Sequence, residues 1–88
     1  PALPAVQVFP NPTSVAVRIS LGKVSGPVQL KIVDAQGRTI WKYEGEAPAY
    51  GLTWNGKTTS GQRAASGTYY LTLQQHNRQS TTILRVQR

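Results

Sequence analysis

The fold is decided by residues 15–21, VAVRISL, in which four aliphatic side chains alternate with Ala, Arg and Ser. A β-strand turns successive side chains to opposite faces, so this stretch has one apolar face and one largely polar face. Residues 28–32 (VQLKI) and 68–73 (TYYLTL) repeat the alternation. Each stretch predicts a strand with one side in a core and the other side in water.

Four weaker stretches complete the set: residues 5–9, 39–43, 50–54 and 80–86, which carry β-branched, aromatic and other apolar residues. No stretch shows the i, i+3, i+4 spacing of an amphipathic helix. Short strands at near-regular spacing predict an all-β fold, a seven-stranded antiparallel immunoglobulin-like β-sandwich. We expect residues 1–88 to form this single domain, with residues 1–4 as the remnant of a linker.

The turn residues agree with the strand pattern. Residues 34–37 (DAQG) place Asp where its side chain caps a type I turn and Gly where a positive φ is needed. Residues 55–56 (NG) can supply both positive-φ residues of a tight turn. Residues 56–67 are polar with few apolar side chains, which predicts a long surface loop.

The two tryptophans are interpreted as core residues. Trp54 is expected to pack between the sheets rather than to serve as a platform for a sugar or a base. In residues 39–43, Ile40 and Lys42 share one face and Trp41 lies on the other. The lysine predicts that the face of Trp41 is buried and that Ile40 lies outside.

The composition limits the chain to a small domain. With 88 residues, it can bury one core but has little room for a deep catalytic cavity. There is no Cys, which excludes disulfides and thiolate metal sites. No apolar run approaches the roughly 18 residues that cross a bilayer. Because the sequence starts PALP and has no Met, we expect it to be a piece of a longer protein.

The charge is strongly positive, with ten Lys and Arg against Asp34, Glu44 and Glu46, a net charge of +7. Such a balance favours acidic partners such as nucleic acid, anionic polysaccharide or a lipid surface, or else it keeps the domain soluble. Most aromatic residues follow the inward pattern and leave few platforms for base stacking. Nucleic-acid binding is therefore not the favoured interpretation.

The sequence shows no catalytic constellation. His76, the single imidazole, lies in a predicted loop tip with no nucleophile pattern nearby. Glu44 and Glu46 offer too few oxygens for Ca²⁺, and no phosphate-binding glycine loop is present. We expect the domain not to be an enzyme, to use no cofactor and to have no catalytic or metal-binding residues.

Three ordered motifs carry a family resemblance: residues 8–12 (VFPNP), residues 31–38 (KIVDAQGR) and residues 66–71 (SGTYYL), followed by a last strand that ends in basic residues. Together they resemble the C-terminal sorting domains of the type IX secretion system. The resemblance implies a sandwich at the C-terminus of a cargo protein, which directs the cargo from the periplasm across the outer membrane. Some members of that family lose the domain on export and others keep it.

The resemblance also implies partners and a location. The partners would be secretion-machinery and sortase-like proteins of the outer membrane, with anionic lipopolysaccharide as a further candidate. The cargo would pass through the periplasm and reach the outer-membrane surface or the medium. The residues expected to take part in partner recognition are Pro10, Asn11, Pro12, Gly37, Arg38, Gly67, Tyr69, Arg85, Val86 and Arg88.

These residues would act in different ways. Gly37 and Gly67 are expected to shape the backbone. The last strand would offer an edge for pairing or a basic tail for docking.

A second resemblance points elsewhere. Residues 54–57 (WNGK), 60–61 (SG) and 66–69 (SGTY) are similar to the immunoglobulin-like part of flagellar hook-capping proteins and to extracellular repeat modules. This alternative implies the same sandwich in a structural or adhesive module without a sorting role. An anionic-polysaccharide binder is the remaining alternative.

Overall fold

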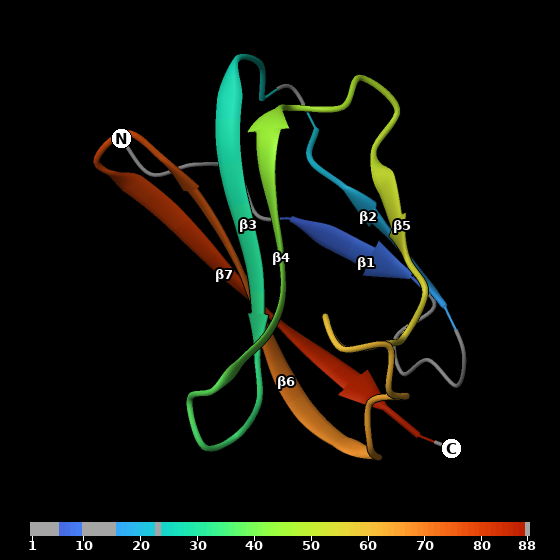
Figure 1. Cartoon of the computed structure of the whole chain (residues 1–88). Helices are drawn as coiled ribbons and strands as arrows, with labels where there is room; N and C mark the ends of the chain where they lie inside the picture. The colour runs from blue at the N-terminus through green and yellow to red at the C-terminus, as the bar shows by residue number, and fades with distance from the viewer. Residues whose placement is uncertain (1–5, 10–15, 23, 88) are drawn as a thin grey trace.

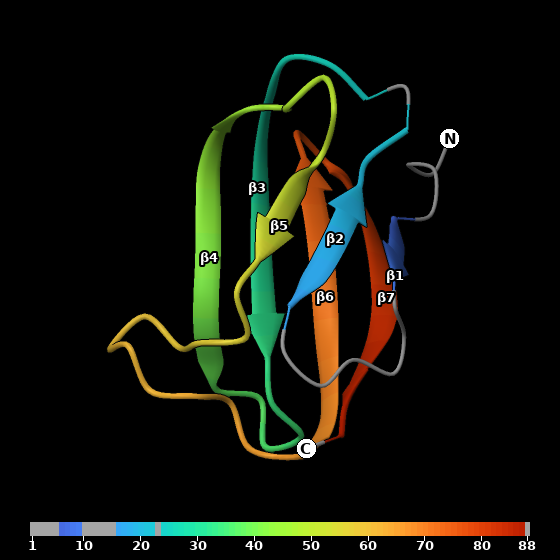
Figure 2. The same cartoon turned by 90° about the vertical axis from the view of Figure 1, so that its right-hand side faces the viewer.

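The computed structural model describes residues 6–9, 16–22 and 24–87, which form two antiparallel β-sheets packed face to face (Figures 1 and 2). The strands are β1 (Gln7–Phe9), β2 (Val17–Ser20), β3 (Pro27–Val33), β4 (Thr39–Glu46), β5 (Leu52–Trp54), β6 (Gly67–Gln75) and β7 (Arg78–Val86). One sheet has the order β1-β2-β5 and the other β4-β3-β6-β7. This architecture confirms the predicted seven-stranded immunoglobulin-like sandwich.

The core lies between the two sheets, where the alternating apolar residues of the sequence meet. Ile19, Leu30, Ile32, Leu71, Leu73 and Leu84 are fully buried. Trp54 is only 1% exposed, which confirms its predicted place in the core. Its indole Nε1 donates a hydrogen bond to the carbonyl of Lys57, at 2.9 Å.

A β-bulge changes the expected orientation of β4. Ile32 pairs with Trp41 and Val33 pairs with Thr39, so Ile40 has no residue opposite it. Trp41 and Ile40 are both partly buried against the core. The prediction that the face of Trp41 is inward is confirmed, whereas the outward placement of Ile40 is wrong. The extra residue of the bulge breaks the strict alternation on which that placement depended.

The turn between β3 and β4 has the predicted geometry. The Asp34 carboxylate accepts hydrogen bonds from the backbone N–H of Gln36 (3.0 Å) and of Arg38 (2.9 Å). Gly37 has a φ of 87°, a conformation that glycine adopts without steric cost. The hydrogen-bonded carboxylate and the glycine together fix a short connection between the two strands.

The second predicted turn differs from expectation at one residue. Gly56 has a φ of 80°, but His76 is the sole non-glycine residue with positive φ in the ranges that the structure describes. The predicted positive φ of Asn55 is therefore wrong. Its side-chain Oδ1 instead accepts a hydrogen bond from the backbone N–H of Lys57, at 3.0 Å, so Asn55 stabilises the turn as an Asx residue.

The long connection between β5 and β6 is attached to the sandwich rather than projecting from it. Thr59 donates two hydrogen bonds to the carbonyl of Ile40, from its backbone N–H (2.8 Å) and from its hydroxyl (3.0 Å). Ala64 is buried. The loop lies at the surface as predicted, and it also covers one backbone carbonyl on the edge of β4, which reduces edge-to-edge pairing there.

A buried glutamine ties the β6–β7 turn to the start of β3. The side-chain Nε2 of Gln75 donates to the carbonyls of Ser25 (2.6 Å) and Pro27 (3.3 Å). Its Oε1 accepts a hydrogen bond from Arg78, at 3.1 Å.

Among the residues that the structure describes, there is no helix with the length and apolar character of a membrane span.

Candidate functional site

The middle motif, the closing motif and the last strand converge at one end of the sandwich, the lower end in Figures 1 and 2. A groove of about 310 Å³ runs between the β3–β4 turn and residues 65–69, and Arg38 and Gly67 line it. A second groove of about 360 Å³ lies between residues 66–68 and the end of β7, where Arg85 and Val86 line it. Residues 66–68 form a wall of both grooves. The tertiary structure therefore brings together segments that lie far apart in the sequence.

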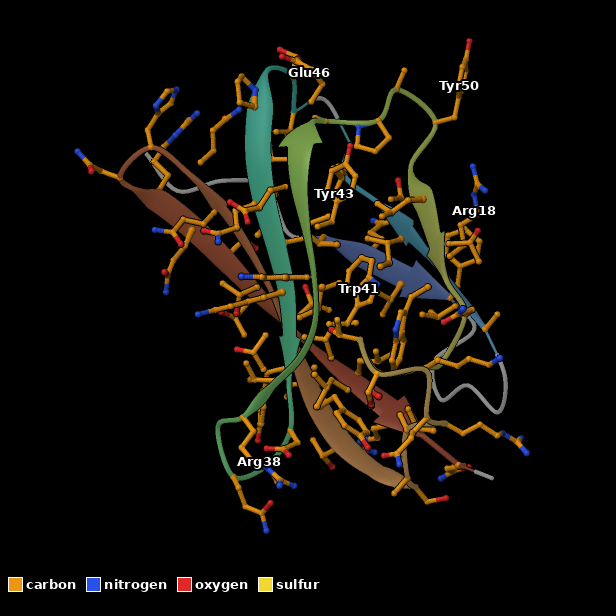
Figure 3. All side chains as sticks on the ribbon, viewed as in Figure 1. Arg18, Arg38, Trp41, Tyr43, Glu46 and Tyr50 are labelled. Atoms are coloured by element: carbon orange, nitrogen blue, oxygen red, sulfur yellow. The ribbon has the colours of Figure 1, made fainter. Side chains whose placement is uncertain are left out.

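Arg38 provides the exposed charge of the first groove. Its Nε donates to the Oδ2 of Asp34 at 2.9 Å, while its side chain remains 76% exposed. The hydrogen bond from the backbone N–H of Arg38 is the main cause that holds the pKa of Asp34 below its ordinary value. The ionised carboxylate fixes the turn and orients the guanidinium, which lies at the tip of the hairpin in Figure 3.

Tyr69 serves the site from inside the core. Its side chain is only 6% exposed, and its hydroxyl donates a 2.6 Å hydrogen bond to the carbonyl of Ala65. Its ring meets that of Trp54 edge to face, with centroids 6.4 Å apart. A tyrosine near the start of this strand that bonds back to the preceding loop is the tyrosine corner of immunoglobulin-like sandwiches. Tyr69 thus fixes the wall that the two grooves share.

The other predicted site residues divide by exposure. Val86 is buried like Tyr69, whereas Gly37, Arg38, Gly67 and Arg85 are exposed. An added Cβ at Gly37 or Gly67 would meet nothing within 4 Å, so no neighbouring side chain covers the surface at either glycine. Pro10, Asn11, Pro12 and Arg88 lie outside the described residues. Their roles, like those of the other six, stay predictions.

The residues weighed for catalysis do not meet at this end. His76 lies in the β6–β7 turn, at the opposite end of the sheet from the β3–β4 turn (Figure 1). Within the described ranges, no group of three or more His, Cys, Asp and Glu side chains could hold a metal ion. The end of the sandwich that carries the two grooves, which we call the groove end, can instead donate hydrogen bonds from guanidinium and backbone groups to an acidic or carbonyl-bearing partner.

One long-range contact, away from the two grooves, could not be predicted from the sequence. The Nη2 of Arg18 on β2 donates a hydrogen bond to the carbonyl of Tyr50, and Tyr50 is 87% exposed. Figure 3 shows its ring projecting from the connection between β4 and β5. Alternation predicted that Arg18 lies outside, but its partner is 32 residues away and no local pattern indicates it.

Two solved structures with the same fold come from Porphyromonas gingivalis. The first is PorZ, described as an essential bacterial surface component of the type IX secretion system, with a TM-score of 0.77 and 26% identity over 94% of this chain. The second is dimeric latent PorU, with a TM-score of 0.67 and 21% identity over 92% of this chain. The chain spans only 11% and 9% of those proteins. The similarity to PorZ agrees with the resemblance to type IX sorting domains.

The family comparison covers most of the chain. No curated protein matched the sequence, whereas the family of the FlgD Ig-like domain matches residues 5–79. The match includes the segments whose residues resemble hook-capping proteins, and it spans β1 to β6 of the sandwich. The chain therefore belongs to the FlgD Ig-like domain family.

Proposed function

We propose that this chain is the sorting domain of a larger exported protein and that proteins of the type IX secretion system recognise it. The observation that carries the proposal is the convergence of the two motif segments and the last strand around two adjoining grooves. These are the segments that resemble sorting domains. The similarity to a small part of PorZ supports the same role.

In this proposal the domain acts by binding and not by catalysis. Its recognition end presents Arg38 and Arg85, together with the glycine-containing wall at residues 66–68. Arginine is well suited to such a surface because its guanidinium forms several directed hydrogen bonds. The partners are secretion-machinery and sortase-like proteins, the cargo passes through the periplasm to the cell surface, and no cofactor takes part. Anionic lipopolysaccharide is a secondary candidate because of the net charge of +7.

A reporter fusion tests the proposal. The chain is fused to the C-terminus of a periplasmic reporter in a host with an active type IX system, and surface exposure is measured by protease accessibility. We expect the wild-type fusion to reach the surface. Retention of the folded fusion in the periplasm contradicts the proposed sorting role.

A groove variant then tests the site. Ala35→Trp places a large ring in the groove beside Arg38 and Gly67, and we expect surface exposure to fall roughly tenfold, as for a residue central to an interface. Gln62→Trp is the matched control, because Gln62 is exposed and lines a groove on the other side of Arg38. Equal export of both variants contradicts the role of this end.

The second candidate function is a structural or adhesive module without a sorting role, and membership of the FlgD Ig-like family favours it. Such a module needs the sandwich but not the grooves. A parent protein that reaches the surface equally well without residues 1–88 supports this candidate. Loss of its export on the same deletion supports sorting.

A further inference from the structure

The outer face of the four-stranded sheet carries its side chains in rows that cross the strands. The pairing register places Lys42 opposite Lys31, Val33 opposite Tyr70, and Tyr70 opposite Ile83. Successive rows from the middle of the sheet towards the end that carries the two grooves are Lys42–Lys31–Thr72–Thr81, then Thr39–Val33–Tyr70–Ile83, then Thr68–Arg85. We call Val33, Tyr70 and Ile83, the three apolar residues of the second row, the apolar row.

The apolar row is exposed in the middle of a polar face. Tyr70 is 37% exposed and Ile83 is 51% exposed, although both are large hydrophobic residues. Val33 extends the row onto a third strand and is half-buried. Adjacent apolar side chains within a polar surface are typical of a contact site, whereas single exposed ones need no explanation.

Positive charge flanks the apolar row on both sides. Lys31 and Lys42 face each other across β3 and β4, although like charges in directly opposite positions destabilise a sheet. In the described residues neither lysine forms an ion pair. Exposed Arg85 lies on the other flank. The arrangement is complementary to an apolar stripe with acidic groups on each side.

The dimensions fit one kind of partner. Four residues along a strand separate the lysine row from the row of Arg85, a distance of about 13 Å, and an α-helix with its side chains is about 10–12 Å across. The edge strand of this sheet on this side is β7, whereas β3 and β6, which carry Val33 and Tyr70, have neighbours on both sides. An extended peptide laid across Val33 and Tyr70 therefore finds no backbone edge. A helix needs none, because its backbone hydrogen bonds are internal.

We propose that this face binds an acidic amphipathic helix of a partner protein, with its apolar stripe on Val33, Tyr70 and Ile83. Acidic side chains on the two flanks of the helix meet Lys31 and Lys42 on one side and Arg85 on the other. The inference rests on the proposed function, because it specifies a partner for a domain that acts by recognition. A polyanionic glycan matches the charge but not the apolar row.

A peptide titration tests the inference directly. The probe is a designed helix of about 14 residues, roughly 21 Å long, with leucines along one stripe and glutamates on both flanks. The control probe has lysine in place of each glutamate. We expect the acidic helix alone to shift the amide NMR signals of β3, β6 and β7 in the ¹⁵N-labelled domain. Equal binding of both helices, absence of binding, or tighter binding of polygalacturonate overturns the proposal.

Variants identify the face. Lys31→Glu with Lys42→Glu reverses one flank, and Tyr70→Ser with Ile83→Ser removes the apolar row. We expect each pair to weaken binding of the acidic helix at least about tenfold. The matched charge control is Lys57→Glu with Arg63→Glu, an exposed cationic pair bridged within the β5–β6 loop. Wild-type affinity in the first two variants, with thermal unfolding unchanged, overturns the proposal.

The reporter fusion separates this inference from the proposed function. If the wild-type fusion reaches the surface and the Lys31→Glu, Lys42→Glu fusion does so equally, the helix-binding face is overturned as the site of a sorting partner, and the sorting role stands. If the acidic helix binds as expected but the wild-type fusion stays in the periplasm, the sorting role is overturned and the helix-binding face is supported.

Discussion

The hydroxyl of Tyr69 donates a hydrogen bond to the carbonyl of Ala65, four residues earlier, at 2.6 Å. The bond joins the start of β6 to the loop that precedes it, and it holds the wall shared by the two grooves. Tyr69, which is expected from the sequence to take part in partner recognition, therefore lies in the core and supports the groove wall from there. Its neighbours Gly67 and Thr68 lie nearer the surface of this wall, Gly67 exposed and Thr68 partly buried.

Tyr69→Phe tests this bond while keeping the ring in place. The carbonyl of Ala65 loses its partner, and we expect the free energy of unfolding to fall by about 1–2 kcal/mol in urea titrations. Tyr70→Phe is the matched control, because Tyr70 lies on the outer face and is 37% exposed; we expect a change within about 0.5 kcal/mol. Equal effects at both positions contradict the tyrosine-corner assignment.

Gly51→Ala is expected to be strongly destabilising. Gly51 has a φ of 78°, and an added Cβ would collide with the carbonyl oxygen of Ile19 on β2. We expect a loss of about 2–4 kcal/mol, from backbone strain together with displacement of β2. Gly61→Ala isolates the strain, because Gly61 has a φ of 90° and open space around it. If Gly51→Ala lowers the free energy of unfolding no more than Gly61→Ala does, the close approach to the Ile19 carbonyl does not contribute to the effect.

Asp34 is expected to make the domain sensitive to acid. Hydrogen bonds to its carboxylate, chiefly from the backbone N–H of Arg38, lower the pKa of Asp34 in the folded state. A lowered pKa stabilises the fold above the unfolded-state pKa, and the stabilisation disappears as the pH falls through the folded-state value. Urea unfolding from about pH 5 down to about pH 2 should therefore show a weaker pH dependence for Asp34→Asn than for the wild type. If the free energy of unfolding of Asp34→Asn depends on pH as steeply as that of the wild type, the lowered pKa of Asp34 is not the source of the acid sensitivity.

Gln75→Leu tests the buried amide. It leaves the carbonyls of Ser25 and Pro27 without their side-chain donor, and we expect a loss of about 1–3 kcal/mol on thermal or urea unfolding. Gln74→Leu is the neighbouring control, since Gln74 is exposed on the outer face. We expect that substitution to change stability by no more than about 0.5 kcal/mol. A tolerated Gln75→Leu indicates that the residue only fills space.

Much of the fold follows from local chemistry. The alternation in residues 15–21, 28–32 and 68–73 predicts strands because a pleated backbone turns successive side chains to opposite faces of the sheet. The Asp34 turn was predictable because its hydrogen bonds join residues at most four positions apart. The errors at Ile40 and Asn55 have a common origin. In both, the contacts around the residue set the backbone conformation, and the residue type did not. At Ile40 the cause is the bulge in the pairing of β3 with β4; at Asn55 it is the hydrogen bond of its side chain with the backbone N–H of Lys57.

The sequence by itself determined the strand pattern, the inward face of each main strand, the buried place of Trp54 and the short turn after Asp34. The tertiary structure decided which strands are neighbours, and with that the rows on the outer sheet face and the convergence of residues 34–38, 65–69 and 85–87. The physical reason is that parity and turn geometry act over a few residues. Strand pairing joins residues tens of positions apart, such as Leu30 and Leu73, and their contact depends on the burial of the whole core.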